Sequence, residues 1–147
     1  MAEHNIIGKK GEQIAVETMR KKGFRVVDTN WKFGHLEMDV IAVNRMEIAF
    51  VEVKTRTSSF GDKRPEEFVD ELKRRRMAAA ANAYIKIHQI ELVPRLDIIC
   101  ISMDPNTYEV KELTHLADAF LPPQRTIGKS SFSGQGRWKH RGRVIGK

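Results

Sequence analysis

The sequence predicts a mixed α/β fold in the order helix, three strands, helix, two strands. Apolar residues recur with helical spacing near the amino end and again after Pro65. Residues 36–43 and 47–55 are rich in apolar and β-branched residues and are separated by a turn signal, and residues 96–103 form a strongly apolar run. This order indicates a mixed sheet flanked by helices.

The first predicted element is a helix from Asn5 to Lys22. Asn5 suits its amino cap, and Gly23 suits the position just after its last turn. Its apolar stripe contains Gly8, Ala15 and Met19. Residues 24–30 follow as a first strand, with Val26 and Val27 at its centre.

The next two elements are predicted to pair as a hairpin. Residues 36–43 and residues 47–55 each read as a strand, and Asn44-Arg45 between them is typical of a turn.

The second half of the domain is predicted to begin with one long helix. Pro65 suits a first helical turn, and the helix would run to about His88. Its core stripe is predicted to contain Phe68, Val69, Leu72, Met77, Ala80, Ala81, Tyr84 and Ile85. Strands at 96–103 and 108–113 and a small helix near 116–120 complete the order.

The positive charge of the chain is concentrated at its carboxyl end. The net charge is +7, from 26 Lys and Arg against 19 Asp and Glu. Seven of the basic residues and none of the acidic ones lie from Pro122 onwards, so residues 1–121 are balanced. We therefore predict a neutral domain over 1–121 and a flexible basic tail over 122–147, because Gly, Ser, Gln and basic residues dominate the tail.

The tail interleaves aromatic and basic side chains, a composition that suits contact with nucleic acid. Aromatic rings stack on unpaired bases while cations meet phosphate. The candidate contacts are Arg137, Trp138, Lys139, Arg141 and Arg143. The alternative is a disordered, solubilising end.

The remaining composition argues for a cytoplasmic protein without a membrane partner. Cys100 is the one cysteine, so no disulfide can form within the chain, and its apolar surroundings favour an inert core residue. The amino end lacks the apolar stretch of a signal peptide, and no apolar run approaches the ~20 residues of a membrane span. The five histidines show no spacing that suits a zinc site.

The hairpin is predicted to gather acidic side chains on one face. Side chains alternate across a strand, and a turn at Asn44-Arg45 places Glu37 opposite Glu52 and Asp39 opposite Phe50. Asp39 is then a diagonal neighbour of Glu52. A three-residue turn would instead place the acids on opposite faces.

Carboxylates grouped in this way favour a bound cation. Glu37, Asp39 and Glu52 repel one another unless positive charge lies nearby, and Lys54 supplies only one charge. Oxygen ligands suit Mg²⁺ or Mn²⁺, which lower the pKa of bound water and polarise phosphate esters. Lys54 would orient that water or neutralise charge on phosphate. The alternative is a solvated sheet face with cross-strand Glu–Lys pairs.

Glu12 is a further candidate because it shares the apolar stripe of the first helix. An acid in that place lies either at the boundary of the core or in a site.

A series of motifs in one order resembles the YraN family of uncharacterised bacterial proteins over residues 5–121. These motifs are Gly8-x-x-Gly11-Glu12-x-x-Ala15, Gly23-Phe24, Asn30-Trp31, Glu37-Met38-Asp39-Val40-Ile41-Ala42, Val51-Glu52-Val53-Lys54-Thr55-Arg56, Phe60-Gly61, Val69 with Lys73, and Arg95-Leu96-Asp97. That family is similar in pattern to PD-(D/E)xK nucleases, above all archaeal Holliday-junction resolvases. The resemblance implies a restriction-endonuclease-like αβββαβ core and a metal-dependent deoxyribonuclease. Leu36 and Lys32 depart from the family, which usually has Gly and Arg there.

The resemblance also implies roles for individual residues. Asp39, Glu52 and Lys54 take the catalytic positions, and Glu12 takes that of the helical glutamate of the resolvases. Asp39, Glu52 and the backbone carbonyl of Val53 would ligate metal. Arg56 and Lys73 would contact phosphate.

The dense run Lys73-Arg74-Arg75-Arg76 is either a solvated helix face or a track for a phosphate backbone. Resolvases of the related type are typically dimers, because two strands need two cuts, so a homodimer is an alternative to a monomer.

Three functions compete at this point. The first is a magnesium-dependent endonuclease that hydrolyses phosphodiesters in DNA, branched DNA included. The second is a nucleic-acid-binding protein that keeps the fold without turnover. The third is a scaffold whose acidic patch docks a protein partner. Clustered carboxylates facing phosphate favour the first, because a binding module has no need of them.

Overall fold

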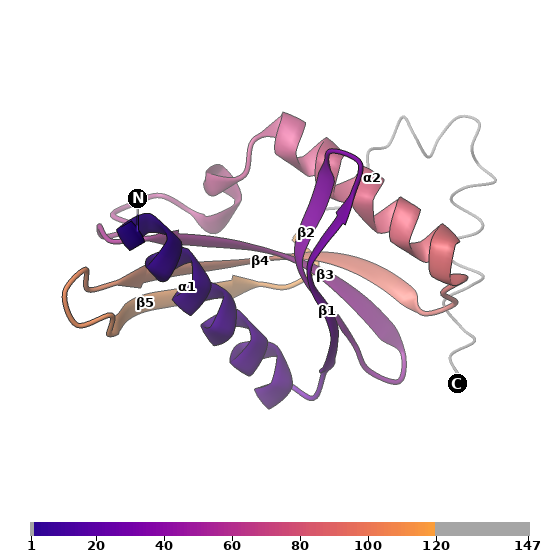
Figure 1. Ribbon diagram of the computed structural model, residues 1–147, viewed down its shortest axis with the longest axis horizontal. Helices are drawn as coiled ribbons and strands as arrows, with labels where there is room; N and C mark the ends of the chain where they lie inside the picture. Colours follow the sequence, from indigo (N-terminus) through magenta and orange to yellow (C-terminus); the bar gives the residue numbers. More distant parts are fainter. Residues whose placement is uncertain (1, 120–147) are drawn as a thin grey trace.

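Five strands form one mixed sheet, and one long helix lies on each of its faces (Figure 1). The structure is a computed structural model that describes residues 2–119. Its elements are α1 (Ala2–Lys21), β1 (Arg25–Phe33), β2 (Leu36–Val43), β3 (Glu47–Arg56), the 3₁₀ helix η1 (Pro65–Phe68), α2 (Glu71–His88), β4 (Val93–Met103) and β5 (Val110–Leu116). The strand order is β1-β2-β3-β4-β5, with β3 and β4 parallel and the other neighbours antiparallel. The predicted mixed α/β class and the restriction-endonuclease-like order are confirmed.

Two hydrophobic clusters hold the helices to opposite faces of the sheet. Ala15 and Met19 of α1 pack with one set of strand residues, which includes Val51. Met77 and Tyr84 of α2 pack with the other set, which includes Phe50. Side chains alternate along β3, so each helix packs on its own apolar face of that strand. The polar residues at the end of β3 alternate between the same two faces.

The first helix ends where predicted but begins earlier. Gly23 adopts φ +93° after the last turn, a left-handed conformation that glycine reaches without strain. Asn5 lies inside α1, so its predicted role as the amino cap is wrong. The first strand extends to Phe33, three residues beyond the predicted end at Asn30.

The β2–β3 hairpin keeps the predicted faces but has a different register. The Asn44 amide donates to the Glu47 carbonyl at 2.9 Å, and Asn44 Oδ1 accepts from the amides of Met46 and Glu47. The loop is therefore Arg45-Met46, because Asn44 pairs with Glu47 and its side chain also accepts the amides of the turn. Val43 pairs with Ile48.

This register corrects the predicted pairing of the acids. Continued along the strands, it sets Asp39 opposite Glu52, so neither Glu37 opposite Glu52 nor Asp39 opposite Phe50 was right. The shift is two residues, which preserves the face of every side chain.

The predicted long helix is two elements. Residues 65–68 form η1, Val69 is extended and buried, and α2 starts after Asp70, whose side chain accepts the Lys73 amide at 2.8 Å. An N-cap carboxylate inside the expected helix thus outweighs Pro65 as a start signal. Leu72 follows this new start and is 54% exposed, so its placement in the core was wrong.

The carboxyl end of the domain differs from the prediction in three places. Strand β4 begins at Val93 rather than at residue 96, and β5 runs to Leu116. Tyr108 adopts φ +64° in the preceding turn and so cannot start β5. The expected helix near 116–120 is the end of β5 followed by a turn up to Ala119, whose amide donates to the Leu96 carbonyl at 2.7 Å. Residue 120 and the predicted tail over 122–147 lie outside the described residues.

Within residues 2–119, neither long helix has the length and apolar character needed to cross a bilayer.

Candidate active site

Asp39 and Glu52 meet where the paired part of the β2–β3 hairpin ends. The ladder runs from Val43 with Ile48 to Val40 with Val51 and stops there. At the next position the Asp39 carboxylate accepts the backbone amide of Val53 at 2.8 Å. A side chain thus takes the hydrogen bond that a strand carbonyl would otherwise accept, and it is fixed beside Glu52.

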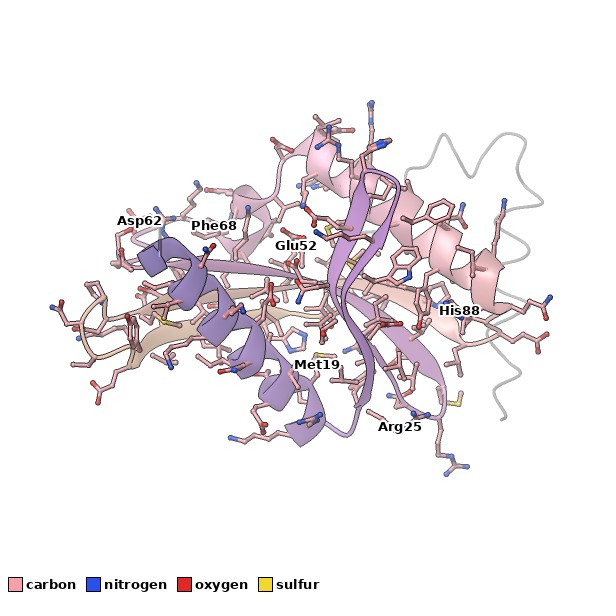
Figure 2. All side chains as sticks on the ribbon, viewed as in Figure 1. Met19, Arg25, Glu52, Asp62, Phe68 and His88 are labelled. Atoms are coloured by element: carbon pink, nitrogen blue, oxygen red, sulfur yellow. The ribbon has the colours of Figure 1, made fainter. Side chains whose placement is uncertain are left out.

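Glu52 is a buried acid with little compensating charge. It is 5% exposed, and Lys73 Nζ, from the first turns of α2, lies 3.5 Å from its Oε1 (Figure 2 labels Glu52). Burial, followed by the nearby charge of Asp39, raises the pKa of Glu52 to about 7, and Lys73 and Lys54 only partly offset this. The carboxyl group is therefore poised to exchange a proton, or to meet a cation, near neutral pH.

Asp39 has the same imbalance. Burial raises its pKa above the ordinary value, and the charges of Glu12 and Glu37 raise it further. The Val53 amide and the charge of Lys73 act in the opposite direction but do not cancel the rise. Two neighbouring acids whose ionised forms are both disfavoured are the arrangement expected of a cation site or an acid–base site.

Glu12 approaches this pair from the other face of the sheet. It is half-buried on α1 and accepts a hydrogen bond from Asn30 Nδ2 at 2.9 Å. One residue earlier, Gly11 lies so close to Thr55 of β3 that a Cβ atom would overlap the threonine side chain. The missing side chain lets α1 approach β3 and brings Glu12 within electrostatic range of Asp39.

Glu37 is at the rim of the site rather than in it. Its side chain is exposed and pairs with Lys32 at 3.8 Å. Its charge still acts on Asp39, which favours an accessory role for Glu37 over that of a metal ligand.

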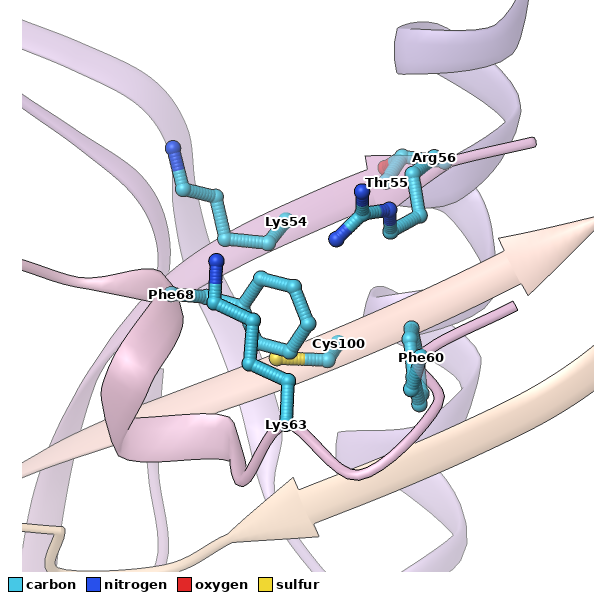
Figure 3. A pocket seen from close by; sticks show the side chains of 7 residues that line it. All are labelled: Lys54, Thr55, Arg56, Phe60, Lys63, Phe68 and Cys100. Carbon is cyan, nitrogen blue, oxygen red and sulfur yellow. The ribbon is translucent and has the colours of Figure 1, made fainter. Parts of the chain in front are cut away.

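Lys54 joins the acids to two basic pockets. One pocket of about 280 Å³ also contacts Arg56, Lys63, Phe60 and Phe68, with Cys100 at its floor (Figure 3). A second, of about 230 Å³, is lined by Lys54, Phe68, Asp70, Leu72, Lys73 and Arg76. The alternation of β3 sets Glu52, Lys54 and Arg56 in one row, so acids and cations occupy successive positions of one surface.

The basic run of α2 divides into residues near the site and residues away from it. Lys73 pairs with Glu52, and Arg76 lines the smaller pocket. Arg75 pairs with Glu71 of its own helix at 3.5 Å, and Arg74 is half-buried. The predicted contacts at Arg137, Trp138, Lys139, Arg141 and Arg143 lie outside the described residues.

Sequence reasoning missed five residues of the larger pocket, namely Thr55, Phe60, Lys63, Phe68 and Cys100. Lys63, Phe60 and Phe68 come from the segment after β3, which was read as a loop and the start of a helix. Phe60 belongs to the Phe60-Gly61 motif, but residues 60–68 mix basic, acidic and aromatic side chains, so no local pattern marked Lys63 or Phe68.

The donors at the acidic pair suit a hard divalent cation with few protein ligands. Within residues 2–119, no group of three or more His, Cys, Asp and Glu side chains is close enough to hold a metal ion. The set is instead two carboxylates, Asp39 and Glu52, to which the family resemblance would add the backbone carbonyl of Val53. Mg²⁺ is commonly held by one or two carboxylates, with waters and substrate phosphate as its other ligands. Two buried acids with raised pKa also lack the positive charge that such an ion brings, so the residues fit it.

A different buried acid, Asp97, is fully partnered. It is 0% exposed and accepts from Arg95 Nη2 at 3.1 Å and from the Asp118 amide at 2.9 Å. His115 Nε2 lies 2.7 Å from the same carboxylate, and Lys22 Nζ lies 2.7 Å from His115 Nδ1. Because an ammonium group only donates, Nδ1 is the acceptor and Nε2 carries the proton given to Asp97.

Comparison with known proteins agrees with the motifs. The model of the uncharacterised protein family UPF0102 matches residues 11–101. The chain belongs to this family. It contains Glu12, Asp39, Glu52 and Lys54 within the matched part, and the resemblance to the YraN family is confirmed.

Curated relatives cover most of the chain. A UPF0102 protein of Bacteroides thetaiotaomicron is 40% identical over 123 residues, which is 84% of this chain and 98% of the relative. One from Flavobacterium psychrophilum is 39% identical over 121 residues, 82% of this chain and 98% of its own length. One from Parabacteroides distasonis is 40% identical over 125 residues, 85% of this chain and the whole of the relative.

Proposed function

We propose that this protein is a divalent-metal-dependent endonuclease that hydrolyses phosphodiester bonds in DNA. The observation that carries the proposal is the buried pair Asp39 and Glu52, whose pKa values are both raised, at the edge of a surface lined by cations. An acidic pair beside several basic side chains suits a phosphate substrate that arrives with a cation.

Asp39, Glu52 and the Val53 carbonyl would hold the ion. When bound, a divalent cation supplies Lewis-acid activation of water and of the phosphate. The hydrogen bond from the Val53 amide fixes the Asp39 carboxylate beside β3. Lys73 is the present counter-charge of Glu52, and it would be released toward phosphate when a cation takes its place.

The remaining residues serve the phosphate. Hydrolysis adds water to phosphorus, breaks one P–O bond and leaves extra negative charge on the phosphoryl oxygens during the reaction. Lys54 lies two residues beyond Glu52 on the same face of β3 and would neutralise that charge. Glu12 and its partner Asn30 maintain the negative field around Asp39.

Cleavage assays test this proposal. Labelled single-stranded, duplex, flap and four-way-junction DNA would be incubated with Mn²⁺ or Mg²⁺ and, separately, with EDTA. Wild type is expected to cut only with metal, and Glu52→Gln is expected to lower the rate at least about a hundredfold, the scale of losing a group that stabilises transition-state charge. Glu17→Gln, which removes an exposed acid of α1, is the matched control and is expected to retain activity.

Binding of DNA without metal-dependent cutting of any substrate would overturn the nuclease proposal. That result would favour a binding protein that keeps the fold without turnover, with Lys54 as a contact rather than a catalytic residue.

A further inference from the structure

The larger basic pocket has a composition that the acidic pair does not require. Phosphodiester hydrolysis needs the acids and Lys54, yet Arg56 and Lys63 come from two different segments and both lie over the ring of Phe68 (Figure 3). The rings of Phe60 and Phe68 have centroids 5.4 Å apart and are tilted by 60°. They form an apolar corner beside the three cations of the pocket.

The cations of this pocket are available to an anion. Within residues 5–119, none of Lys54, Arg56 and Lys63 forms an ion pair with a carboxylate, and no carboxylate lines the pocket. Arg56 Nε donates to Ser58 Oγ at 3.1 Å, which orients the guanidinium and leaves its terminal nitrogens for another acceptor. The Arg56 and Lys63 charges lie 5.1 and 4.6 Å from the centroid of the Phe68 ring. The ring thus holds both cations in place.

The size of the pocket limits what it can take. Small-ligand sites commonly span roughly 300 to 1,000 Å³, and this one is about 280 Å³. One nucleotide unit fits that scale, whereas a base-paired step of a duplex does not. Phe60 and Phe68 are half-buried against the core, so each ring is held in place while part of it still faces the pocket. Aromatic rings beside cations form the usual platform for an unstacked base.

We infer that this pocket binds one unpaired nucleotide of a DNA strand next to the phosphate that is cut, with Arg56 and Lys63 on its phosphate and Phe60 and Phe68 against its base. This inference rests on the proposed nuclease function for the identity of the neighbouring site. Glu52, Lys54 and Arg56 occupy every second position of β3 and so share one face, and each two-residue step advances about 6.6 Å along the strand. The strand therefore leads from the acids into the pocket. The preferred substrate is DNA with a single-stranded segment at the cut, rather than continuous duplex.

Binding measurements without metal test the inference separately from cleavage. The full chain would be titrated in EDTA against a fluorescent blunt duplex and against the same duplex carrying an unpaired tail. Wild type is expected to bind the tailed DNA more tightly. Phe68→Leu keeps an apolar side chain but loses the aromatic face, and it is expected to weaken binding of the tailed DNA roughly tenfold while changing the blunt duplex less than twofold. Lys63→Gln is expected to lower the salt dependence of binding by about one phosphate contact.

Lys86→Gln is the matched control for Lys63→Gln. Lys86 is exposed in the last turn of α2, about 20 Å from the helix start that adjoins the pockets. Thermal unfolding of Phe68→Leu, Lys63→Gln and wild type would show whether each variant is folded, and Phe60→Leu gives a second test of the aromatic corner.

Equal loss on blunt and tailed DNA, or no loss on either in folded Phe68→Leu and Phe60→Leu, would overturn the inference. Selective binding that depends on these residues, in a protein that cuts no DNA with Mn²⁺, would refute the nuclease while leaving the pocket assignment standing. Metal-dependent cutting without any preference for the tail would support the nuclease and refute the pocket assignment.

Discussion

Two buried acids of the same sheet have opposite surroundings. Asp97 receives donors from Arg95, His115 and a backbone amide. Glu52 has one ion pair, with Lys73 at 3.5 Å, and faces a second acid, Asp39. A buried carboxylate with several donors stabilises the fold. A buried carboxylate that lacks nearby positive charge is destabilised when ionised, and a bound cation would relieve that cost. The contrast separates the part of the molecule that holds the fold from the part that we assign to function.

Isosteric substitutions at the two acids should differ most strongly in stability. Asp97→Asn removes the charge that Arg95 and His115 surround and leaves these partners buried, so we expect a loss of about 3–5 kcal/mol in the free energy of unfolding. Glu52→Gln removes a charge that burial already disfavours, so it should leave stability equal or higher at pH 8. Urea unfolding of both variants measures the difference. A loss in Glu52→Gln as large as that in Asp97→Asn would show that the two acids are equivalent.

The stability of the wild-type protein should fall with rising pH because Glu52 loses its proton. The folded pKa is about 7 and the ordinary value is 4.5, so the folded state binds more protons than the unfolded state between these values. The stability contributed by protonated Glu52 is present below pH 4.5 and is lost as pH rises through about 7, on the order of 3 kcal/mol in all. Glu52→Gln should lack this decline, which thermal unfolding from pH 5 to pH 8 would reveal.

The effect of a divalent metal on the melting temperature also tests the acidic pair. Because protons compete with a cation for Asp39 and Glu52, Mn²⁺ or Mg²⁺ should raise the melting temperature of wild type more at pH 8 than at pH 6. The Glu52→Gln variant should respond little at either pH. Identical pH profiles in wild type and variant, with no effect of metal, would mean that the acidic pair is no cation site.

Local sequence patterns predicted most of the fold. Alternation in residues 36–55 identified the hairpin, and because side-chain direction repeats every two residues, a register error of two left Asp39, Glu52 and Lys54 on the predicted face. Gly23 ended the first helix for the conformational reason expected. The errors arose where two local signals competed, as Pro65 and Asp70 did for the start of α2.

The surroundings of the site depend on tertiary contacts that no local pattern contains. Lys73 was expected to contact phosphate, and its pairing with Glu52 follows from how α2 crosses the sheet. Phe60, Lys63 and Phe68 meet Lys54 only because the segment after β3 folds back over that strand. The full partnering of Asp97 needs β5, the turn at Asp118 and Arg95 together.

The smallest expected effect concerns the contact that brings Glu12 to the acidic pair. At Gly11 an added Cβ would overlap the Thr55 hydroxyl, and rotation of that side chain would still leave the Cβ in a tight contact, 3.1 Å from Thr55 Cβ. Gly11→Ala should therefore cost about 1–3 kcal/mol for overpacking. The better helix propensity of alanine, worth up to about 1 kcal/mol, offsets part of this loss.

Gly8→Ala is the matched control, because nothing lies within 4 Å of a Cβ at that position of the same helix. It should gain up to about 1 kcal/mol from helix propensity alone. If Gly11 also positions Glu12, the Gly11→Ala variant should lose DNA cleavage beyond its loss of stability, when assayed well below its melting temperature, while Gly8→Ala retains it. Equal behaviour of the two variants would mean that α1 does not depend on the Gly11–Thr55 contact.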